Sequence, residues 1–324
     1  MIIITGGAGF IGANIAAMLY KSGREIAIID RLGSEEKWRN IAAIRPAHIL
    51  PPDQLGDFLH KHRAKIEMVI HMGASSSTTE KNVDFIIENN FTYSLWLWQW
   101  CTTHQKRLIY ASSAATYGKG EHGFDDNETL EYLDKLSPLN PYGWSKALTD
   151  SAFLRNVSQK NKPQQWVGLK FFNVYGPYEA HKGSQRSVAH QLFQQIEETG
   201  EVKLFKSANP NYEDGGQMRD FIYVKDCCEI IRFFIDNPGV NGIYNAGSGK
   251  ARSFLDLAYA AFATMKKPVK INWMETPDHI AKHYQYFTEA NMNKIKQAGF
   301  QTPLHELEAG IEDYYQYFLL EEQA

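Results

Sequence analysis

The stretch Thr5-Gly6-Gly7-Ala8-Gly9-Phe10-Ile11-Gly12 follows directly on the apolar run Ile2-Ile3-Ile4 and leads into a helix-like segment, residues 11–21. Glycines at this spacing between a strand and a helix are typical of the turn that holds the pyrophosphate of a dinucleotide. Gly6 permits the tight turn, Gly9 lets backbone amides approach the phosphates, and Gly12 lets the helix pack closely on its strand. A purely structural strand-turn-helix connection is the alternative.

The next apolar run, Ile26-Ala27-Ile28-Ile29, ends in Asp30, where a ribose-binding acid is expected. Asp30 alone favours NAD, because its carboxylate accepts hydrogen bonds from a free 2′-hydroxyl and repels a 2′-phosphate. Arg31 and Lys37 are cations that can offset this repulsion. We therefore expect NADP as the cofactor, with NAD as the less favoured alternative.

The composition is that of an ordinary globular protein, with 324 residues, 44% of them hydrophobic and 22% charged. A formal net charge of −3 without a run of lysine or arginine argues against nucleic acid as a partner. Neither a leader peptide nor an apolar segment of membrane-spanning length is recognisable, so no membrane association is expected. Cys101, Cys227 and Cys228 lack a CxxC spacing, which favours a reducing compartment. We expect a cytoplasmic protein.

Short apolar runs alternate with helical segments through the first half of the chain, which predicts a parallel sheet with helices on both faces. The expected fold is α/β, a Rossmann-type doubly wound parallel sheet with a smaller, interleaved C-terminal substrate domain. The dinucleotide-binding domain is predicted to comprise residues 1–172 and 218–248, and the substrate-binding domain residues 173–217 and 249–324. Strands are predicted at 2–4, 25–29, 47–50, 68–71, 107–111, 167–172, 221–224 and 242–245.

The segment Tyr93-Ser94-Leu95-Trp96-Leu97-Trp98-Gln99-Trp100-Cys101 is apolar almost all round a helix. Such a helix must be buried on more than one side. Either it is sandwiched within one chain, or a second subunit covers it, and the pattern does not distinguish these alternatives.

A serine, a tyrosine and a lysine are expected to converge at the carboxyl edge of the sheet. Ser113 ends a predicted strand, and Tyr142 and Lys146 share one face of a predicted helix. A phenol with a pKa near 10 is a poor base at neutral pH, but an ammonium and a positively charged nicotinamide both favour the phenolate. Tyr142 is thus predicted to exchange a proton with the substrate. Lys146 is predicted to lower the pKa of Tyr142 and to hold the ribose, and Ser113 to form a hydrogen bond with the reacting oxygen. An accidental Tyr/Lys pair on a surface helix is the alternative.

The glycine turn, the strand-end serine and the Tyr-x-x-x-Lys pair together resemble the extended short-chain dehydrogenase/reductases, and the resemblance covers nearly the whole chain. Dehydratases of this superfamily carry an Asp-Glu pair directly after the active-site serine or threonine. Here Ala114 and Ala115 occupy those positions. Elimination of water therefore lacks the Asp-Glu pair that serves as its acid and base. Oxidation followed by reduction does not require that pair.

Further stretches resemble the ADP-L-glycero-D-manno-heptose 6-epimerase family, namely residues 75–80 (SSSTTE), 112–118 (SSAATYG), 172–177 (FNVYGP) and 179–184 (EAHKGS). In that family the lysine of the last stretch, here Lys182, is a second acid/base that faces Tyr142 across the substrate. Inversion requires hydride to leave one face of the alcohol and return to the opposite face of the ketone. The oxygen moves between these steps, so each orientation needs its own proton partner. A diphosphate-binding cation is the alternative role for Lys182.

The resemblance also implies contacts with substrate and cofactor. Arg219 is expected to clamp the diphosphate in a bidentate manner, and a salt bridge to Asp220 or Asp226 is its alternative. Two departures concern the substrate side, because the family's substrate-contacting histidine falls on Gln191 and the loop before Arg219 is longer through 214–217. No metal site is expected, because the oxidation and re-reduction that the resemblance implies requires no metal. The substrate is expected to contact Ser113, Asn173, Ser184, Gln191, Phe205, Arg219 and Tyr284, and the cofactor Gly6, Gly9, Phe10, Ile11, Gly12, Asp30, Arg31, Lys37, Met72, Gly73, Ala74, Ser75, Ser76, Asn89, Tyr142, Lys146, Val174 and Lys182.

The activity that the resemblance implies is inversion of C6″ of ADP-D-glycero-β-D-manno-heptose to the L-glycero form, by transient oxidation and re-reduction with bound NADP. It also implies a homo-oligomer, a pentamer in the family, and a place in the synthesis of the lipopolysaccharide inner core. One alternative is a 4-epimerase or reductase acting on another nucleotide sugar, which the 179–184 stretch argues against. The other is a non-catalytic NADP-binding sensor or scaffold, which the Tyr/Lys pair argues against.

Overall fold

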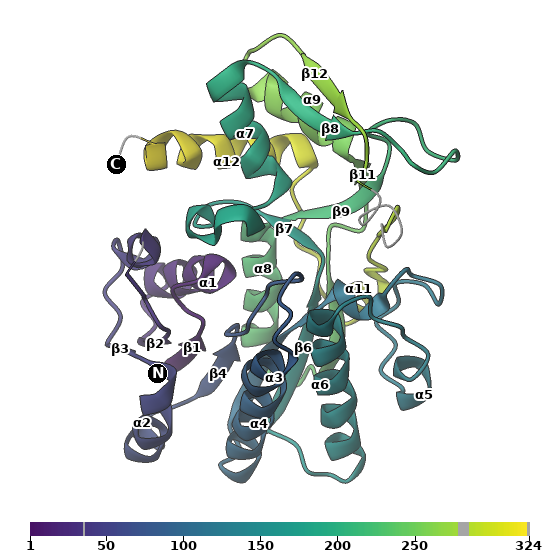
Figure 1. Cartoon of the computed structure of the whole chain (residues 1–324). Helices are drawn as coiled ribbons and strands as arrows, with labels where there is room; N and C mark the ends of the chain where they lie inside the picture. The colour runs from purple at the N-terminus through teal and green to yellow at the C-terminus, as the bar shows by residue number, and fades with distance from the viewer. Residues whose placement is uncertain (35, 278–284, 323–324) are drawn as a thin grey trace.

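Seven parallel strands form the central sheet of the computed structural model, which describes residues 1–34, 36–277 and 285–322 (Figure 1). The strand order is β10-β6-β5-β4-β1-β2-β3, so the direction of winding reverses between β1 and β4. Ligands of open α/β sheets bind at such a reversal, outside the carboxyl ends of the strands. The predicted doubly wound sheet is confirmed. Its strands are β1 (Ile2–Thr5), β2 (Ile26–Ile29), β3 (His48–Leu50), β4 (Met68–His71), β5 (Arg107–Ser113), β6 (Gln165–Phe171) and β10 (Gly242–Ala246).

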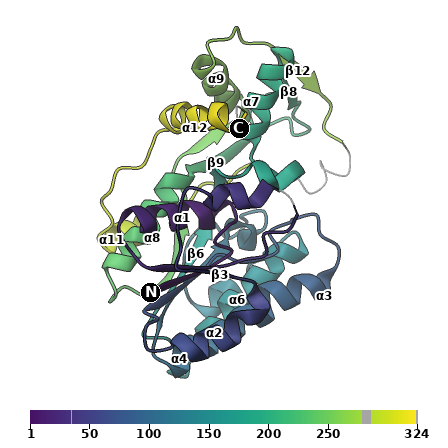
Figure 2. The same ribbon diagram turned by 90° about the vertical axis from the view of Figure 1, so that its left-hand side faces the viewer.

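Helices cover both faces of this sheet, with α1 packed against α8 and α4 packed against α6 (Figure 2). Every residue of β1, β2 and β4 is buried, which explains why their sequences are continuous apolar runs rather than alternating ones. The helical elements of this part are α1 (Phe10–Lys21), η1 (Glu36–Ile41), η2 (Pro52–Gln54), α2 (Leu55–His62), α3 (Val83–Ile86), the π-helical turn η3 (Ile87–Thr92), α4 (Tyr93–Thr103), η4 (Ala114–Tyr117), α5 (Leu130–Leu133), α6 (Pro141–Ser158), α8 (Val224–Asp236) and α11 (Asn293–Gln297).

A smaller unit with its own apolar core lies at the top of Figure 1. Its strands form a three-stranded sheet, β11-β9-β7, and a two-stranded sheet, β12-β8. The strand predicted near 221–224 is present as β9 but belongs to this small sheet, whereas β10 returns to the large one. The exact domain boundaries stay a prediction. The elements are β7 (Asn173–Tyr175), η5 (Ala180–Gln185), α7 (Val188–Thr199), β8 (Val202–Phe205), β9 (Met218–Tyr223), β11 (Ala251–Ser253), α9 (Phe254–Thr264), β12 (Ile271–Met274) and α12 (Leu307–Glu322).

Helix α4, the apolar segment noted in the sequence, packs on one side within the chain. Its Trp98 stacks on Phe153 of α6 with ring centroids 4.1 Å apart, and Leu97 and Cys101 are also buried. Trp96 remains 39% exposed. The sequence pattern therefore reflects one buried face and one partly exposed apolar face, and the oligomeric state stays a prediction.

The glycine-rich turn brings backbone segments too close together for side chains. Gly6 has a φ of +64°, a left-handed conformation that glycine adopts readily, and a Cβ there would lie 2.7 Å from Gly73 N. A Cβ on Gly12 would lie only 2.0 Å from the carbonyl oxygen of Gly6. The first turn of α1 is thus in direct contact with the turn that precedes it. This contact places the unpaired N–H groups of the helix start at the carboxyl edge of the sheet.

We expect Gly12→Ala to unfold at a lower temperature and to purify without dinucleotide, because the new methyl group must displace the Gly6 carbonyl. Overpacking of this kind costs about 1–3 kcal/mol. Thermal unfolding and analysis of the bound nucleotide measure both effects. The matched control is Gly239→Ala, because a Cβ at that exposed glycine meets open space. Equal melting temperatures and equal nucleotide content in the two variants would contradict the packing argument.

Candidate functional site

Three side chains meet where β5 ends and α6 begins. Helix α6 starts at Pro141 because the Asn140 side chain accepts a hydrogen bond from Gly143 N at 2.8 Å. That start places Tyr142 and Lys146 one helical turn apart on the same face. The structure therefore brings together the residues that the sequence predicted at this edge.

Hydrogen bonds connect this group to the end of β5. The Ser113 side chain acts on the Tyr142 phenol and favours its ionised form, so it lowers the pKa of that phenol. Ser113 Oγ also accepts from Ala115 N at 3.1 Å, which caps the short helix η4. Lys146 Nζ donates to the carbonyl oxygen of Ala111 at 2.8 Å. Lys146 is thus held by the backbone of β5, and Ser113 by the backbone of η4.

Burial governs the protonation of the group. It raises the pKa of the Tyr142 phenol, and the hydrogen bond with Ser113 opposes that rise. Burial lowers the pKa of Lys146 to about 8, and the nearby Asp150 carboxylate opposes the fall. The pKa of His71 falls to about 3 through burial and the charge of Lys146, so this histidine is neutral. Lys146 therefore titrates close to the physiological range.

A chain of buried polar groups joins the ends of β1 and β4 to η3. Thr5 Oγ1 lies 2.6 Å from His71 Nδ1, His71 Nε2 lies 2.9 Å from Ser94 Oγ, and Ser94 donates to Asn90 O at 2.6 Å. Because Ser94 donates onward, this network assigns the imidazole proton to Nε2. Asn90 accepts from Ser75 N at 2.8 Å and donates to Ser75 O at 2.9 Å, which holds the loop after β4.

Lys182 lies on η5, in a loop that is shaped by the buried carboxylate of Glu179. That carboxylate accepts hydrogen bonds from Gly176 N at 3.3 Å, Ser187 N at 2.5 Å and Ser187 Oγ at 2.6 Å. Lys182 Nζ lies 5.4 Å from the ring centroid of Phe10, the first residue of α1. Burial lowers the pKa of Lys182, and the charge of Glu179 opposes that fall.

Two buried asparagines connect this loop to the glycine-rich turn. Each donates to one carbonyl oxygen of the turn and one of the loop: Asn14 to Phe10 and Pro177, and Asn40 to Ala8 and Tyr178, at 2.9 to 3.2 Å. Lys182 is therefore held on the β1 side of the strand reversal, while Tyr142 lies on the β5 side, with β4 between them.

A cavity of about 290 Å³ opens beside Asp30, and its lining residues are Arg31, Leu32, Gly33, Ser34, Lys37 and His181. Both carboxylate oxygens of Asp30 have partners, Ala8 N at 2.9 Å and Lys37 Nζ at 2.5 Å. Arg31 pairs with Asp53 at 3.2 Å on the surface, where such pairs contribute little stability. Burial lowers the pKa of His181 to about 4, so its ring is neutral. The cavity thus presents Arg31 and Lys37 next to a carboxylate that is already ion-paired.

The predicted substrate residues are spread over the smaller unit. Arg219 on β9 is 8% exposed and its guanidinium carbon lies 5.6 Å from the Phe254 ring centroid. Asp220, one of its alternative partners, accepts from Ser248 and from the backbone of residues 249 and 290. Asn173 and Ser184 are exposed, Phe205 and Gln191 are half-buried, and Tyr284 lies outside the described residues. Their roles stay predictions.

Sequence reasoning missed several residues that build the site. Asn90 holds the Ser75 loop, whereas the predicted Asn89 donates to Phe85 O within its own helix at 2.7 Å. The π-helical turn that orients Asn90 leaves no pattern in the sequence. His181 could have been found from its place beside Lys182. Among the other predicted cofactor residues, Ile11, Met72, Gly73 and Val174 are half-buried and Ala74 and Ser76 are exposed.

No helix within 1–34, 36–277 and 285–322 is long and apolar enough to cross a membrane. Within the same ranges, no group of three or more histidine, cysteine, aspartate and glutamate side chains is placed to hold a metal ion.

Comparison with known proteins gives concordant results. Residues 2–247 match the family described as "NAD dependent epimerase/dehydratase family". The chain is 45% identical to an ADP-L-glycero-D-manno-heptose-6-epimerase of Fusobacterium nucleatum over 100% of its length and 99% of the relative. A crystal structure of the Helicobacter pylori ADP-L-glycero-D-manno-heptose-6-epimerase is similar with a TM-score of 0.79, 27% identity and coverage of 98% and 96% of the two chains. A UDP-glucuronic acid 4-epimerase from Bacillus cereus, in complex with UDP-glucuronic acid and NAD, has a TM-score of 0.78, 25% identity and 99% coverage of both chains.

We expect the Lys146 ammonium of the cofactor-free protein to titrate near pH 8, because burial disfavours its charge more than Asp150 supports it. The ¹³Cε chemical shift of Lys146, followed by NMR and assigned with a Lys146→Met variant, measures this directly. A midpoint close to 10.4, the value of a solvated lysine, would contradict the burial argument.

Proposed function

The chain belongs to the NAD-dependent epimerase/dehydratase family, among its ADP-L-glycero-D-manno-heptose-6-epimerases, and is an enzyme of the isomerase class; from that premise we propose that it inverts C6″ of ADP-D-glycero-β-D-manno-heptose to the L-glycero form. The observation that supports this proposal is that Tyr142, at the end of β5, and Lys182, beside the start of α1, lie on either side of β4. The product would supply L-glycero heptose to the inner core of lipopolysaccharide.

The site fits a nicotinamide dinucleotide. The close contacts at Gly6 and Gly12 leave no room for a Cβ at either position, so the backbone of the turn can approach a pyrophosphate at the start of α1. Lys146 would hold the nicotinamide ribose, and Asp30, Arg31 and Lys37 would lie beside the adenosine ribose. When bound, the nicotinamide would take a hydride from C6″ and return it to the same carbon.

Tyr142 and Lys182 each have a role that follows from the geometry of inversion. Tyr142, whose pKa Ser113 lowers, would accept the proton of the alcohol in one orientation of the substrate side chain. Rotation of the carbonyl carries the oxygen toward Lys182, which would donate a proton in the other orientation. The pKa values of Lys146 and Lys182 are both lowered by burial, so each lysine can exchange protons closer to neutral pH than a solvated lysine.

We further propose NADP as the preferred cofactor. The ion pair with Lys37 and the bond from Ala8 occupy the Asp30 carboxylate, which removes the repulsion that otherwise excludes a 2′-phosphate. The adjacent cavity presents Arg31 and Lys37, and Arg31 can leave its exposed partner Asp53 at little cost. NAD, as in the Bacillus cereus epimerase complex, is the alternative.

Tyr142→Phe and Lys182→Ala are each expected to lower the rate of heptose epimerisation about 10²–10⁴-fold while the dinucleotide stays bound, because each removes one proton partner. NMR of the ADP-heptose epimers measures the rate, and absorbance of the released nucleotide measures occupancy. The matched controls are Tyr259→Phe, at an exposed tyrosine, and Lys135→Ala, in an exposed ion pair. Near wild-type turnover in either site variant would refute the assignment of two proton partners.

Arg31→Ala should weaken NADP binding more than NAD binding, since a lost charge-assisted bond to phosphate costs about 1.5–3 kcal/mol, or more than tenfold in affinity. Arg45→Ala, at an exposed arginine outside the cavity lining, should bind both nucleotides as the wild type does. Calorimetry gives the affinities, and mass analysis of nucleotide released from the denatured wild type gives the natural cofactor. Recovery of NAD alone together with an unchanged preference in Arg31→Ala would overturn the NADP assignment.

A further inference from the structure

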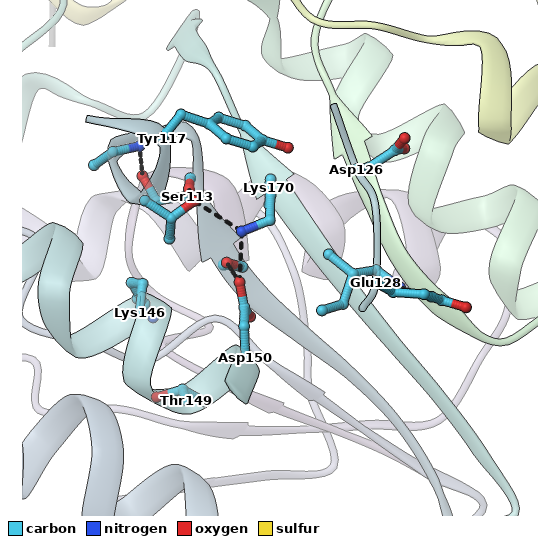
Figure 3. A network of polar contacts seen from close by, with 12 residues as sticks. Ser113, Tyr117, Asp126, Glu128, Lys146, Thr149, Asp150 and Lys170 are labelled. Atoms are coloured by element: carbon cyan, nitrogen blue, oxygen red, sulfur yellow. Dashed lines mark hydrogen bonds and ion pairs between the residues drawn. The ribbon is translucent and has the colours of Figure 1, made fainter. Parts of the chain in front are cut away.

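Asp150 and Lys170 form an ion pair in the interior behind the Ser113, Tyr142 and Lys146 group, and Figure 3 shows Lys170 between Asp150 and the turn that follows Ser113. Lys170 Nζ lies 2.6 Å from Asp150 Oδ2, and both side chains are 0% exposed. Asp150 lies one turn after Lys146 on α6, and Lys170 lies on β6, the neighbour of β5.

Residues of β5 and η4 make further contacts with both members of the ion pair. The carboxylate also accepts from the hydroxyl groups of Tyr110 at 3.0 Å and Ser112 at 2.7 Å. The ammonium lies 5.0 Å from the ring centroid of Tyr117. Both charges therefore have specific partners in a site that water does not reach.

These contacts hold the last three residues of β5, the segment that ends in Ser113. Ala111 and Ser112 are hydrogen-bonded to side chains of α6. Ser113 is linked to Lys170 of β6 through Thr116 of η4. The contacts are Lys146 Nζ to Ala111 O (2.8 Å), Ser112 Oγ to Asp150 Oδ2 (2.7 Å), Lys170 Nζ to Thr116 Oγ1 (2.7 Å) and Thr116 Oγ1 to Ser113 O (2.8 Å). The ion pair thus connects the strand that carries Ser113 with the helix that carries Tyr142 and Lys146.

Stability of the fold does not by itself account for such a pair. Withdrawing two charges from water is unfavourable, and well-packed apolar residues of similar volume often stabilise a buried site equally well or better. Charged hydrogen bonds, in contrast, fix distance and direction between the elements that they join. A charged pair can therefore fix the relative position of two elements more closely than an apolar contact does.

We propose that Asp150 and Lys170 are positioning residues for the reaction, which hold the end of β5 against α6 at the separation at which Ser113, Tyr142 and Lys146 meet. This inference rests on the proposed function, because it assumes that these three residues act on the substrate and cofactor. It assigns to the pair no contact with either ligand.

The Asp150 carboxylate also acts on the charge of Lys146. Among the described residues, Asp150 on α6 and the neutral His71 on β4 interact electrostatically with Lys146, and Tyr142 shares its face of α6. Burial lowers the pKa of Lys146 to about 8, and Asp150 opposes that fall. Without this carboxylate, Lys146 would lose its proton at a lower pH. Its support for the Tyr142 phenolate would then be lost in the neutral range.

The first test removes one connection and leaves the ion pair intact. Thr116→Val keeps the shape of the side chain but breaks the link from Lys170 to Ser113, so kcat for epimerisation should fall about tenfold with little change in KM. Thr149→Val is the matched control, because the buried Thr149 hydroxyl donates to Ser145 O and Asn90 O, outside this link. The control should keep the wild-type kcat.

The second test removes both charges together, so that no unpaired charge is buried. The double variant Asp150→Leu/Lys170→Met should fold and keep the dinucleotide, while kcat falls about 10- to 100-fold and the ¹³Cε titration of Lys146 moves to lower pH. Lys170→Arg keeps the charge and should recover most of the activity. The loss of kcat in the double variant should grow as pH rises through the shifted midpoint.

The outcomes separate this inference from the function on which it depends. Wild-type kcat in Thr116→Val, or a wild-type Lys146 titration and kcat in the double variant, would overturn the positioning role even if Tyr142→Phe is inactive. A double variant that fails to fold would make Thr116→Val and Lys170→Arg decisive, since neither introduces an unpaired charge. Failure of the wild-type protein to epimerise ADP-heptose would instead refute the proposed function.

Discussion

The contact between Gly12 and the carbonyl oxygen of Gly6 is the constraint on which the rest of the site depends. Only hydrogen fits between them, so α1 begins directly against the end of β1. From this contact follow the position of Phe10 beside Lys182 and the position of the Ala8 amide beside Asp30. Lys182, one of the two proposed proton partners, and the basic cavity are thus placed relative to one short backbone contact.

Lys146 and Lys182 lie in similar electrostatic environments. Lys146 is buried and Lys182 half-buried, which lowers the pKa of each, and each has a buried carboxylate that opposes this effect, Asp150 for Lys146 and Glu179 for Lys182. Each carboxylate in turn also holds backbone or hydroxyl groups of the surrounding loop or strand. The residues that tune the charge of the lysines are therefore the same residues that fix their position. A change at either carboxylate should affect geometry and protonation together.

Local signals in the sequence predicted much of this architecture. The glycine turn, the continuous apolar strands and the Tyr142/Lys146 spacing are each specified within a few residues, so the large sheet and the Ser113 group could be predicted. The assignment of β9 to a separate small sheet, the ion pair of Asp30 with Lys37 and the link from Asn40 to the loop before Lys182 could not. Those features depend on which distant segments meet, and no periodicity in one segment encodes its partner.

Inversion by a returned hydride can be tested with ADP-D-glycero-β-D-manno-heptose that carries deuterium at C6″, incubated with the purified protein and no added nucleotide. The account predicts that NMR will show equilibration of the two C6″ epimers with the deuterium retained at that carbon, since the hydrogen leaves and returns without meeting solvent. Exchange of the deuterium for solvent protons during inversion would indicate proton abstraction at carbon and contradict the account. Absence of inversion would contradict it as well.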